Sequence, residues 1–461
     1  MIRHTALAAL LLATAAPAFA QADMRNLTPM QQEAMDDNLA YAITEGLVTE
    51  VGHRMAGTED EARARAWAEK KLTELGFANV RIETYRMPTW VRGKETAEVL
   101  SPAPQDMHIA ALGTSGSTGD AGIEGEIAYF PSLSRLMAAP AGSLTGKIAF
   151  VTHDMRATQD GSGYGFAGPV RWRGPNFAAR AGASAIVIRS VGTDHHRNPH
   201  TGGTTFDEGV KHIPAGAISN PDADTLERLV ALGRPVRMKL VLTPKDLGMR
   251  ESGNVIAEVP GADPGLPPIV IACHLDSWDL SPSAIDDAAG CGIITAAAKR
   301  VMAMGQPRRT IRLLWAGAEE VGGFGGEAYG KKYGDQPHAL AMESDFGADR
   351  VWKVDFNLAD EALKEEMTLA LAPLGIERGD ASAHGGTDVD AIIAAAKPAV
   401  IDLAQDGTRY FDLHHTPDDT LDKVDPAQIA QNVAAWTTVL QIAANHDGAI
   451  VAGEESHAEG Q

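Results

Sequence analysis

Residues 267–304, PPIVIACHLDSWDLSPSAIDDAAGCGIITAAAKRVMAM, join a short apolar run to a polar stretch and then to a long run of small and apolar residues. The first ten residues, which end at Asp276, have the length and the β-branched content of a buried strand. The residues from Asp286 to Met304 predict a helix. A strand that leads into a helix is the repeating unit of an α/β sheet.

The same alternation continues to the end of the chain and sets the fold class. RRTIRLLWAGAEE (308–320) predicts a strand, and GGEAYGKKY (325–333) predicts a helix. ALAMESD (339–345) and AVIDLA (399–404) predict further strands, and residues 427–445 predict a closing amphipathic helix. We therefore expect an α/β fold, with a mixed central sheet covered by helices on both faces.

Residues 98–250 differ from both flanks because they are rich in glycine and in short β-type runs, such as KIAFVTH, SAIVIRS and VRMKLVLT. They predict a β-rich insert domain with a small core of its own. Helices are expected before it, at 30–52 and 58–76, so the main domain is discontinuous. We expect that domain at 21–97 and 251–455, followed by a flexible tail at 456–461.

The charge balance bears on the partners of the protein, and the N-terminus bears on its location. Its 461 residues carry 40 basic and 61 acidic side chains, a formal charge of −21, which disfavours binding to nucleic acid. The first twenty residues have the charged start, short apolar stretch and small-residue end of a secretory signal peptide, with cleavage expected after Ala20. No later segment is apolar enough to span a membrane, so we expect a secreted or periplasmic protein with no membrane anchor after signal cleavage.

Cys273 and Cys291 are the two cysteines of the chain. Export would permit a disulfide between them. Isolated cysteines in apolar strands and helices are more often small buried core residues, and we favour that interpretation here.

Side chains with nitrogen and oxygen ligand atoms follow the expected strands. In an open α/β sheet, sites form at the carboxyl ends of the strands. His274 ends one strand, Glu319 and Glu320 end the next, and Asp345 ends a third. Asp286 and Asp287 open the helix after the first strand, and a later loop carries Arg409, Tyr410, His414 and His415.

This set has the composition of a metal centre. Each feature alone has an ordinary explanation, since an aspartate at a helix start is often an N-cap and adjacent glutamates often form a solvated turn. Together they favour zinc, and the excess of carboxylates suggests two ions that share a bridging ligand. Mn²⁺ or Co²⁺ could occupy the same ligands because no thiolate is among them. Asp276, two residues after His274 on the same strand face, could accept the second ring N–H of that histidine.

Five motifs, in this order, resemble the M28 family of zinc peptidases: HLDSWDL, AIDDAAG, AGAEE, MESDFG and LHHTPDDT. Upstream, GHRMAGTEDEARARAWAEKKLTELGF resembles the N-terminal signature of that family. GKIAFV and AARAGASAIVIRS resemble a protease-associated (PA) domain, placed as in that family, and IRSVGT, PHTGG, HIPAGAIS and MESD resemble its carboxypeptidase Q branch. The resemblance covers nearly the whole mature chain and implies the zinc-dependent exopeptidase fold.

The resemblance also implies a role for each residue of the set. Asp286 would bridge two zinc ions, and a metal-bridging water would be the nucleophile. Glu319 would be the general base that takes a proton from this water, and Asp276 would orient a metal ligand. The other ligands would be His274 and Asp345 on one ion, and Glu320 and His415 on the other.

Further candidates lie near the expected substrate. Several family members place a tyrosine before the second-metal histidine, where its hydroxyl helps to hold the oxyanion. Here His414 has that position, as in the carboxypeptidase Q branch, and its imidazole could donate the same hydrogen bond. His384, in a glycine-rich loop that faces the substrate in relatives, and Tyr410 are candidates for substrate binding. The cluster DHHRNPH lacks matching carboxylates, so we expect an exposed polar loop there and not another metal site.

The leading hypothesis is an exported dinuclear zinc exopeptidase (aminopeptidase, dipeptidase or carboxypeptidase Q-like) that hydrolyses dipeptides or short peptides with free termini. The resemblance also implies a homodimer. Two alternatives belong to other functional classes. A glutaminyl cyclase-like transferase would use one zinc ion and lack the insert, and a non-catalytic binding protein on the same scaffold would have lost metal ligands. The complete ligand set and the insert argue against both.

Overall fold

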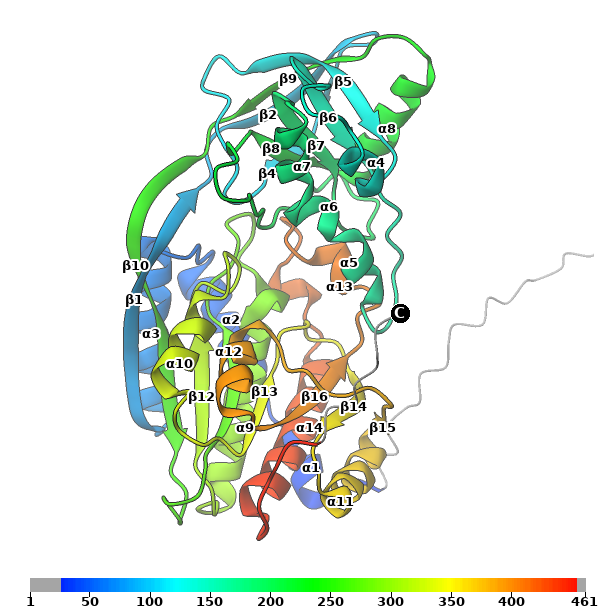
Figure 1. Ribbon diagram of the computed structural model, residues 1–461. Coiled ribbons are helices and arrows are strands. Elements are labelled where there is room, and N and C mark those ends of the chain that lie inside the picture. Colours follow the sequence, from blue (N-terminus) through cyan, green and yellow to red (C-terminus); the bar gives the residue numbers. More distant parts are fainter. Residues whose placement is uncertain (1–25, 454–461) are drawn as a thin grey trace, which may run out of the picture.

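Two mixed β-sheets form the framework of the protein (Figure 1), whose computed structural model describes residues 26–453. In the central sheet, β12, β11, β13 and β16 are parallel neighbours, and antiparallel strands flank them on both sides. This is the mixed sheet that the sequence predicts. In spatial order its strands are β1 (Ala78–Val91), β10 (Lys245–Val259), β12 (Ile311–Ala316), β11 (Ile269–His274), β13 (Leu340–Glu343), β16 (Ala399–Gln405), β14 (Val351–Asn357) and β15 (Glu377–Arg378).

Helices cover both faces of the central sheet, as expected. Successive strand residues alternate between two cores, so that Val255 and Ala257 pack into one and Ile256 into the other. Each core is completed by the apolar sides of the helices on that face. One face carries α1 (Pro29–Met35), α2 (Leu39–Gly46), α3 (Glu59–Glu74), α9 (Ala289–Met304), α11 (Glu361–Leu371) and α14 (Pro426–Asn445), and the other carries α10 (Phe324–Tyr333) and α12 (Thr387–Ala396).

The helix expected at 30–52 is divided between α1, α2 and the single turn η1 (Leu47–Val51). The carboxylate of Asp37 accepts the backbone N–H of Leu39 at 2.8 Å, at the point where α2 begins. A short acidic side chain that satisfies a backbone donor favours a helix start, and here it separates two helices. The helix expected at 58–76 is continuous.

Residues 95–242 leave the central sheet after β1 and return to it at β10, and we call them the insert. They form the second sheet, with apolar cores on both of its faces. In Figure 1 the insert lies above the central sheet, with α5 and α6 on the side of the main body. Its strands, in spatial order, are β3 (Gln105–Met107), β2 (Glu95–Ser101), β9 (Arg237–Leu242), β5 (Ile123–Phe130), β6 (Lys147–Val151), β7 (Ala185–Arg189), β8 (Ala215–Ile218) and β4 (Ile109–Ala111), and its helices are α4 (Leu133–Met137), α5 (Ser162–Ala167), α6 (Pro169–Trp172), α7 (Gly174–Arg180) and α8 (Asn220–Ala231).

The expectation that the cysteines are unbridged is wrong, because Cys273 and Cys291 form a disulfide. Cys273 lies near the end of β11, and Cys291 lies in the first turn of α9, which packs on that strand. Their Cα atoms are 5.2 Å apart, a separation that a disulfide spans without backbone movement. Both side chains are buried, as expected for core residues.

Between residues 26 and 453, no helix has the length and apolar character needed to cross a membrane. The signal peptide expected at 1–20 lies outside the described residues, and so does the tail expected at 456–461.

Candidate metal centre

The residues expected at the strand ends lie together at one edge of the central sheet. β11 and β12 are parallel, and His274 is aligned with Ala316, the last residue of β12. Their carboxyl ends therefore coincide. Asp345 lies two residues beyond β13, and Glu320 lies four residues beyond β12. Asp286 lies before α9 in the turn η2 (Ala284–Ala288), where its own backbone is not helical, and His415 follows α13 (Tyr410–Leu413).

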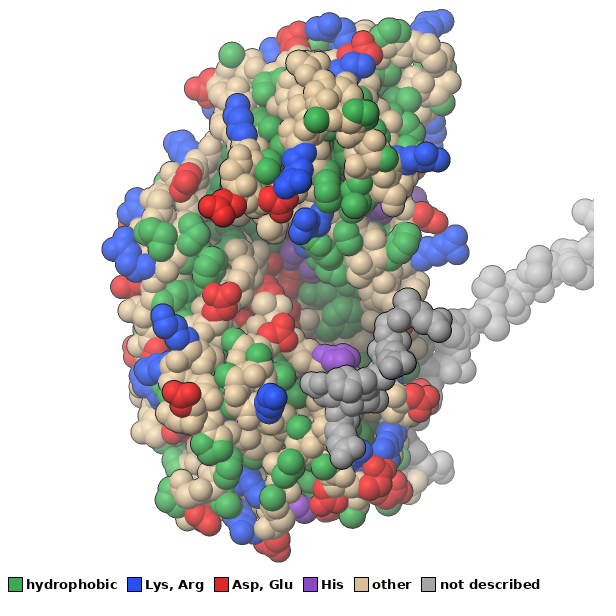
Figure 2. All heavy atoms as spheres, viewed as in Figure 1, with side chains coloured by type: hydrophobic (Ala, Val, Ile, Leu, Met, Phe, Trp, Pro, Cys, Tyr) green, Lys and Arg blue, Asp and Glu red, His purple; other side chains and the backbone are tan. Residues whose placement is uncertain are grey.

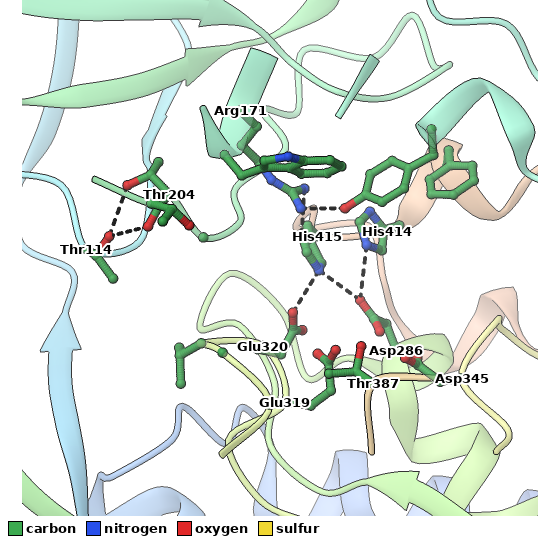
Figure 3. A pocket seen from close by; sticks show the side chains of 18 of the residues that line it. Thr114, Arg171, Thr204, Asp286, Glu319, Glu320, Asp345, Thr387, His414 and His415 are labelled. Carbon is green, nitrogen blue, oxygen red and sulfur yellow. Dashed lines mark hydrogen bonds and ion pairs between the residues drawn. The ribbon is translucent and has the colours of Figure 1, made fainter. Parts of the chain in front are cut away.

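Asp286 lies between two histidine–carboxylate pairs, of which Figure 3 shows the pair of His415 and Glu320. Its Oδ1 is 3.2 Å from Nε2 of His274, and the same nitrogen is 3.3 Å from Oδ1 of Asp345. Its Oδ2 is 3.3 Å from Nε2 of His415, and that nitrogen is 2.8 Å from Oε2 of Glu320. Each oxygen of Asp286 therefore faces a separate pair, as the oxygens of a bridging carboxylate do.

The spacing and burial of these atoms fit metal ligands. Atoms bound at about 2.0 Å in a tetrahedral zinc site are about 3.3 Å from one another. Within these five residues, three carboxylate oxygens are buried without a hydrogen-bond partner: Oδ2 of Asp286, Oε1 of Glu320 and Oδ1 of Asp345. Because an unsatisfied buried carboxylate is costly, these oxygens fit a site that a bound cation would complete.

Burial and the close contacts between acids and histidines also shift the pKa values of the cluster. Burial raises the pKa of Glu320 and of Asp345. Burial acts to lower the pKa of His415, but Glu320 and Asp286 outweigh it and raise that pKa to about 9. In the metal-free protein a proton on the histidine therefore offsets the acids, and a divalent ion would take its place.

Glu319 and Glu320 both line the same cavity although they are adjacent in sequence. β12 ends at Ala316, and Ala318 has a φ of +59°, a left-handed conformation that is unusual for alanine. This turn removes the alternation that would send neighbouring strand side chains to opposite faces. Burial raises the pKa of Glu319.

Asp276 contacts His274 through a different atom from the one expected. Nδ1 of His274 is 3.0 Å from the backbone carbonyl oxygen of Asp276 and 3.7 Å from its Oδ1. The carboxylate instead accepts the backbone N–H of Glu319 at 2.9 Å. Asp276 therefore orients the histidine ring with its backbone and holds the loop of Glu319 with its side chain.

The remaining candidates differ in position. The ring of His414 stacks on that of His415 with ring centres 3.5 Å apart, and its Nε2 is 3.8 Å from Oδ2 of Asp286. Burial, and then the neighbouring His415, hold the pKa of His414 well below its usual range, so its ring is neutral. Tyr410 is buried and lines the cavity, whereas His384 is exposed and is not among the residues that line it.

The insert holds the loop that carries His414 and His415, a contact that the sequence does not indicate. The N–H of Thr201 donates to the carbonyl oxygen of His415 at 3.0 Å, and Nδ1 of His415 is 3.3 Å from the Thr201 carbonyl oxygen. His200 is fully buried, with Nδ1 2.8 Å from the His414 carbonyl oxygen and Nε2 2.6 Å from Oδ1 of Asp194. The polar loop expected at DHHRNPH is therefore exposed only in part.

A cavity of about 460 Å³ connects the candidate centre to the insert. Figure 2 shows a hollow between the two bodies, with acidic side chains inside it. The main body contributes the two glutamates, Asp286 and Asp345 to its lining. From the insert come Tyr164, Arg171, Trp172 and residues 203–205. The volume of the cavity is within the range of small-molecule and cofactor sites.

Known proteins resemble the chain over most of its length. Residues 254–440 match the model of peptidase family M28. The chain is 32% identical to carboxypeptidase Q from Mus musculus over 416 residues, which cover 89% of this chain and 86% of that protein. It is also 32% identical to carboxypeptidase Q from Homo sapiens over 414 residues, which cover 88% and 86% of the two chains.

Solved structures share the fold. A peptidase M28 precursor from Shewanella amazonensis SB2B is 43% identical with a TM-score of 0.89, over 91% of this chain and 96% of that one. A zinc aminopeptidase from Bacillus subtilis has a TM-score of 0.62 at 19% identity, over 90% and 97% of the two chains. From these similarities we conclude that the chain is a metallo-exopeptidase and belongs to peptidase family M28.

Proposed function

We propose that the chain is an exported exopeptidase that binds two zinc ions and hydrolyses dipeptides or short peptides with free termini. The observation that carries the proposal is the position of Asp286, whose two oxygens face the His274–Asp345 pair and the His415–Glu320 pair separately. One ion beside each pair, with Asp286 as the shared ligand, would satisfy the buried oxygens that lack a donor. Mn²⁺ or Co²⁺ would suit the same ligands.

Two bound zinc ions would polarise the scissile carbonyl and lower the pKa of the attacking water. Glu319 would move the proton. It is half-buried at the cavity wall, its carboxylate lies near the ligand atoms of His274 and Asp345, and burial raises its pKa, as suits a general base. It would take the proton of the water and deliver it to the leaving amine. The adjacent Glu320 would hold a metal ion, so the two glutamates have different roles.

Two further residues would position the reacting groups. Asp276 would keep Glu319 in place through its hydrogen bond to the backbone N–H of that residue. His414 would support the oxyanion, because a neutral imidazole has one N–H to donate and the ring lines the cavity beside Asp286. Tyr410 would form part of the cavity wall.

The cavity favours a short substrate. The insert lies over the candidate centre, so the part of a substrate that reaches the centre must fit into a cavity of about 460 Å³ between the insert and the main body. A dipeptide meets that condition more easily than a folded protein does. The homodimer and the PA-domain identity of the insert stay predictions.

Zinc-dependent hydrolysis of free dipeptides tests the proposal. We expect the purified protein to bind two zinc ions and to lose activity when a chelator removes them. Glu319→Gln should lower kcat by about 10²–10⁴-fold while both zinc ions stay bound, because it removes only the proton carrier. Glu320→Gln should instead lower the zinc content. Glu327→Gln, which changes an exposed glutamate on the same segment, is the matched control.

Three outcomes would contradict the proposal. Near wild-type turnover by the Glu319→Gln variant would show that Glu319 is not the general base. Ammonia release from a peptide with an N-terminal glutamine, without peptide hydrolysis, would indicate the transferase. A protein that takes up no zinc would indicate a binding role.

A further inference from the structure

A second cavity, which we call the side cavity, opens beside the candidate metal centre. It has a volume of about 390 Å³, and Asp345, Phe346 and Thr387 line both this cavity and the first one. Figure 3 shows Asp345 and Thr387 beside Asp286 and Glu319. A substrate whose scissile bond lies at Glu319 can therefore reach the side cavity with a neighbouring side chain.

The antiparallel strands β14 and β16 form one wall of the side cavity. Val354 and Leu403 pack into the core on one face of the central sheet. Lys353, Asp355 and Asp402, which alternate with them, project from the opposite face and line the cavity. Asp355 and Asp402 are direct cross-strand partners. Because like charges in that position destabilise a sheet, this wall favours a cation.

Two of the acids on the side cavity have structural partners. Glu343 accepts two backbone N–H groups at the start of α12, and Asp402 accepts two from the loop before that helix. Both therefore shape the cavity while they add to its negative charge. Among the described residues that line the side cavity, Lys353 is the one lysine or arginine.

The other two acids keep capacity to bind a ligand. Asp160 comes from the insert, between β6 and α5, and is exposed; its carboxylate accepts only from Ser162, and no lysine or arginine in the described part of the chain pairs with it. Asp355 is 6% exposed, and its Oδ1 has no hydrogen-bond partner. These two carboxylates face the cavity from the insert and from the main body.

Lys353 shows how this cavity holds a cation. Its Nζ is 2.8 Å from Oδ2 of Asp355 and 5.2 Å from the ring centre of Trp352. Trp352 and Phe346 both line the cavity. Aromatic rings attract a positive charge and pack well against the carbon chain of lysine or arginine. Carboxylates between aromatic walls therefore match a basic side chain.

We propose that the side cavity binds the side chain of the residue on the amino side of the scissile bond and selects lysine or arginine there. The inference rests on the proposed function and adds a substrate class to it. Asp355 and Asp160 accept hydrogen bonds from the charged end of the side chain, and Trp352 and Phe346 pack against its carbon chain. The amino-side residue is directed there because it also carries the ammonium of the peptide, which the same carboxylates attract.

The test compares substrates that differ by one ammonium group. Norleucine has the side chain of lysine without the ammonium, so lysyl-alanine and norleucyl-alanine share both termini. Alanyl-lysine and alanyl-norleucine place the same difference on the carboxyl side. All four are assayed with zinc-loaded wild type, Asp355→Asn, Asp160→Asn and the control Asp154→Asn, and zinc content is measured for each protein. Asp154 is an exposed acid on the same insert loop as Asp160 and does not line the side cavity.

We expect wild type to prefer lysyl-alanine over norleucyl-alanine by at least about tenfold in kcat/KM, the effect of one charged hydrogen bond. It should show no such preference between alanyl-lysine and alanyl-norleucine. Asp355→Asn should remove most of the preference, because Asp355 is buried. Asp160→Asn should lower it by about threefold, since an exposed charge pair is weaker. Asp154→Asn should match wild type.

Equal kcat/KM of wild type for lysyl-alanine and norleucyl-alanine would overturn the inference and leave the proposed function standing. A preference confined to alanyl-lysine would also overturn it, because the side cavity would then bind the carboxyl-side residue. An Asp355→Asn variant that loses the same factor on lysyl-alanine and norleucyl-alanine would overturn it by giving Asp355 a structural role.

Asp160→Asn keeps the test decisive if Asp355→Asn does not fold, because Asp160 is exposed. A wild-type preference that survives unchanged in Asp160→Asn would overturn the inference. Zinc-loaded wild type that hydrolyses none of the four dipeptides would instead refute the proposed function, and the inference with it.

Discussion

The two halves of the candidate metal centre are built in different ways. The His274 half belongs to the central sheet, since His274 is the last residue of β11 and its Nδ1 contacts the Asp276 carbonyl oxygen. The disulfide of Cys273, the preceding residue, ties this strand end to α9. The His415 half lies on a loop, and the groups that hold it come from the insert, 214 residues away in sequence.

This difference shows that the insert is part of the support of the centre as well as a cover over it. Thr201 and His200 fix the backbone of the His414–His415 loop, and the Thr201 carbonyl oxygen lies beside Nδ1 of His415. A histidine that donates from Nδ1 presents Nε2 to a metal ion. One half should therefore be insensitive to the insert, and the other should depend on it.

Replacement of His200 should separate the two halves of the centre most clearly. His200→Asn removes the contact of Nε2 with Asp194 that holds this side chain against the His414 carbonyl oxygen, and should weaken one of two zinc sites by about 10–100-fold, as loss of an outer-shell partner does. The other site should keep its affinity. Zinc titration against a competing chelator resolves the two sites.

His195→Asn is the matched control, because His195 is an exposed neighbour in the same cluster. It should leave both zinc affinities unchanged. Equal weakening of both sites in His200→Asn would show that the two halves are not supported separately. No weakening would show that the insert contacts are dispensable.

His153 should make the stability of the insert sensitive to acid. Burial lowers the pKa of His153 to about 4, against 6.5 for the free side chain, and its Nε2 contacts the Ser190 carbonyl oxygen at 3.1 Å. Because the unfolded state binds the proton first, stability is lost as the pH falls from about 6.5 to about 4, by at most about 3 kcal/mol.

His153→Gln should reduce that loss, because glutamine does not titrate and can still donate to the same carbonyl oxygen. Denaturant unfolding at pH 7 and pH 4.5, with a chelator present throughout, measures it without interference from metal release. His195→Gln should unfold like wild type at both pH values. If the variant is as acid-sensitive as wild type, the loss of stability at low pH comes from other groups.

The sequence predicts much of the His274 half because short, continuous stretches of sequence encode it. The strand before His274 and the helix after Asp286 can be recognised from short apolar runs, and parallel strands bring their carboxyl ends together. The motifs that follow them carry the family resemblance. The central sheet and its helices were predictable for the same reason.

The supports of the centre depend on contacts that no local pattern encodes. His200 and His195 are indistinguishable in sequence, yet one is fully buried against His414 and the other is exposed. The disulfide depends on how closely α9 packs on β11. Asp276 was expected to act through its carboxylate, but its backbone carbonyl lies closer to His274 because the strand ends before it.

The most direct test of the central claim is a crystal structure of the zinc-loaded protein with anomalous diffraction data at the zinc edge. We predict two peaks about 3.5–4 Å apart, as in other two-metal sites. One should lie beside His274 and Asp345 and the other beside His415 and Glu320, with Asp286 between them and Glu319 bound to neither. A single peak, or a peak that Glu319 coordinates, would contradict the account.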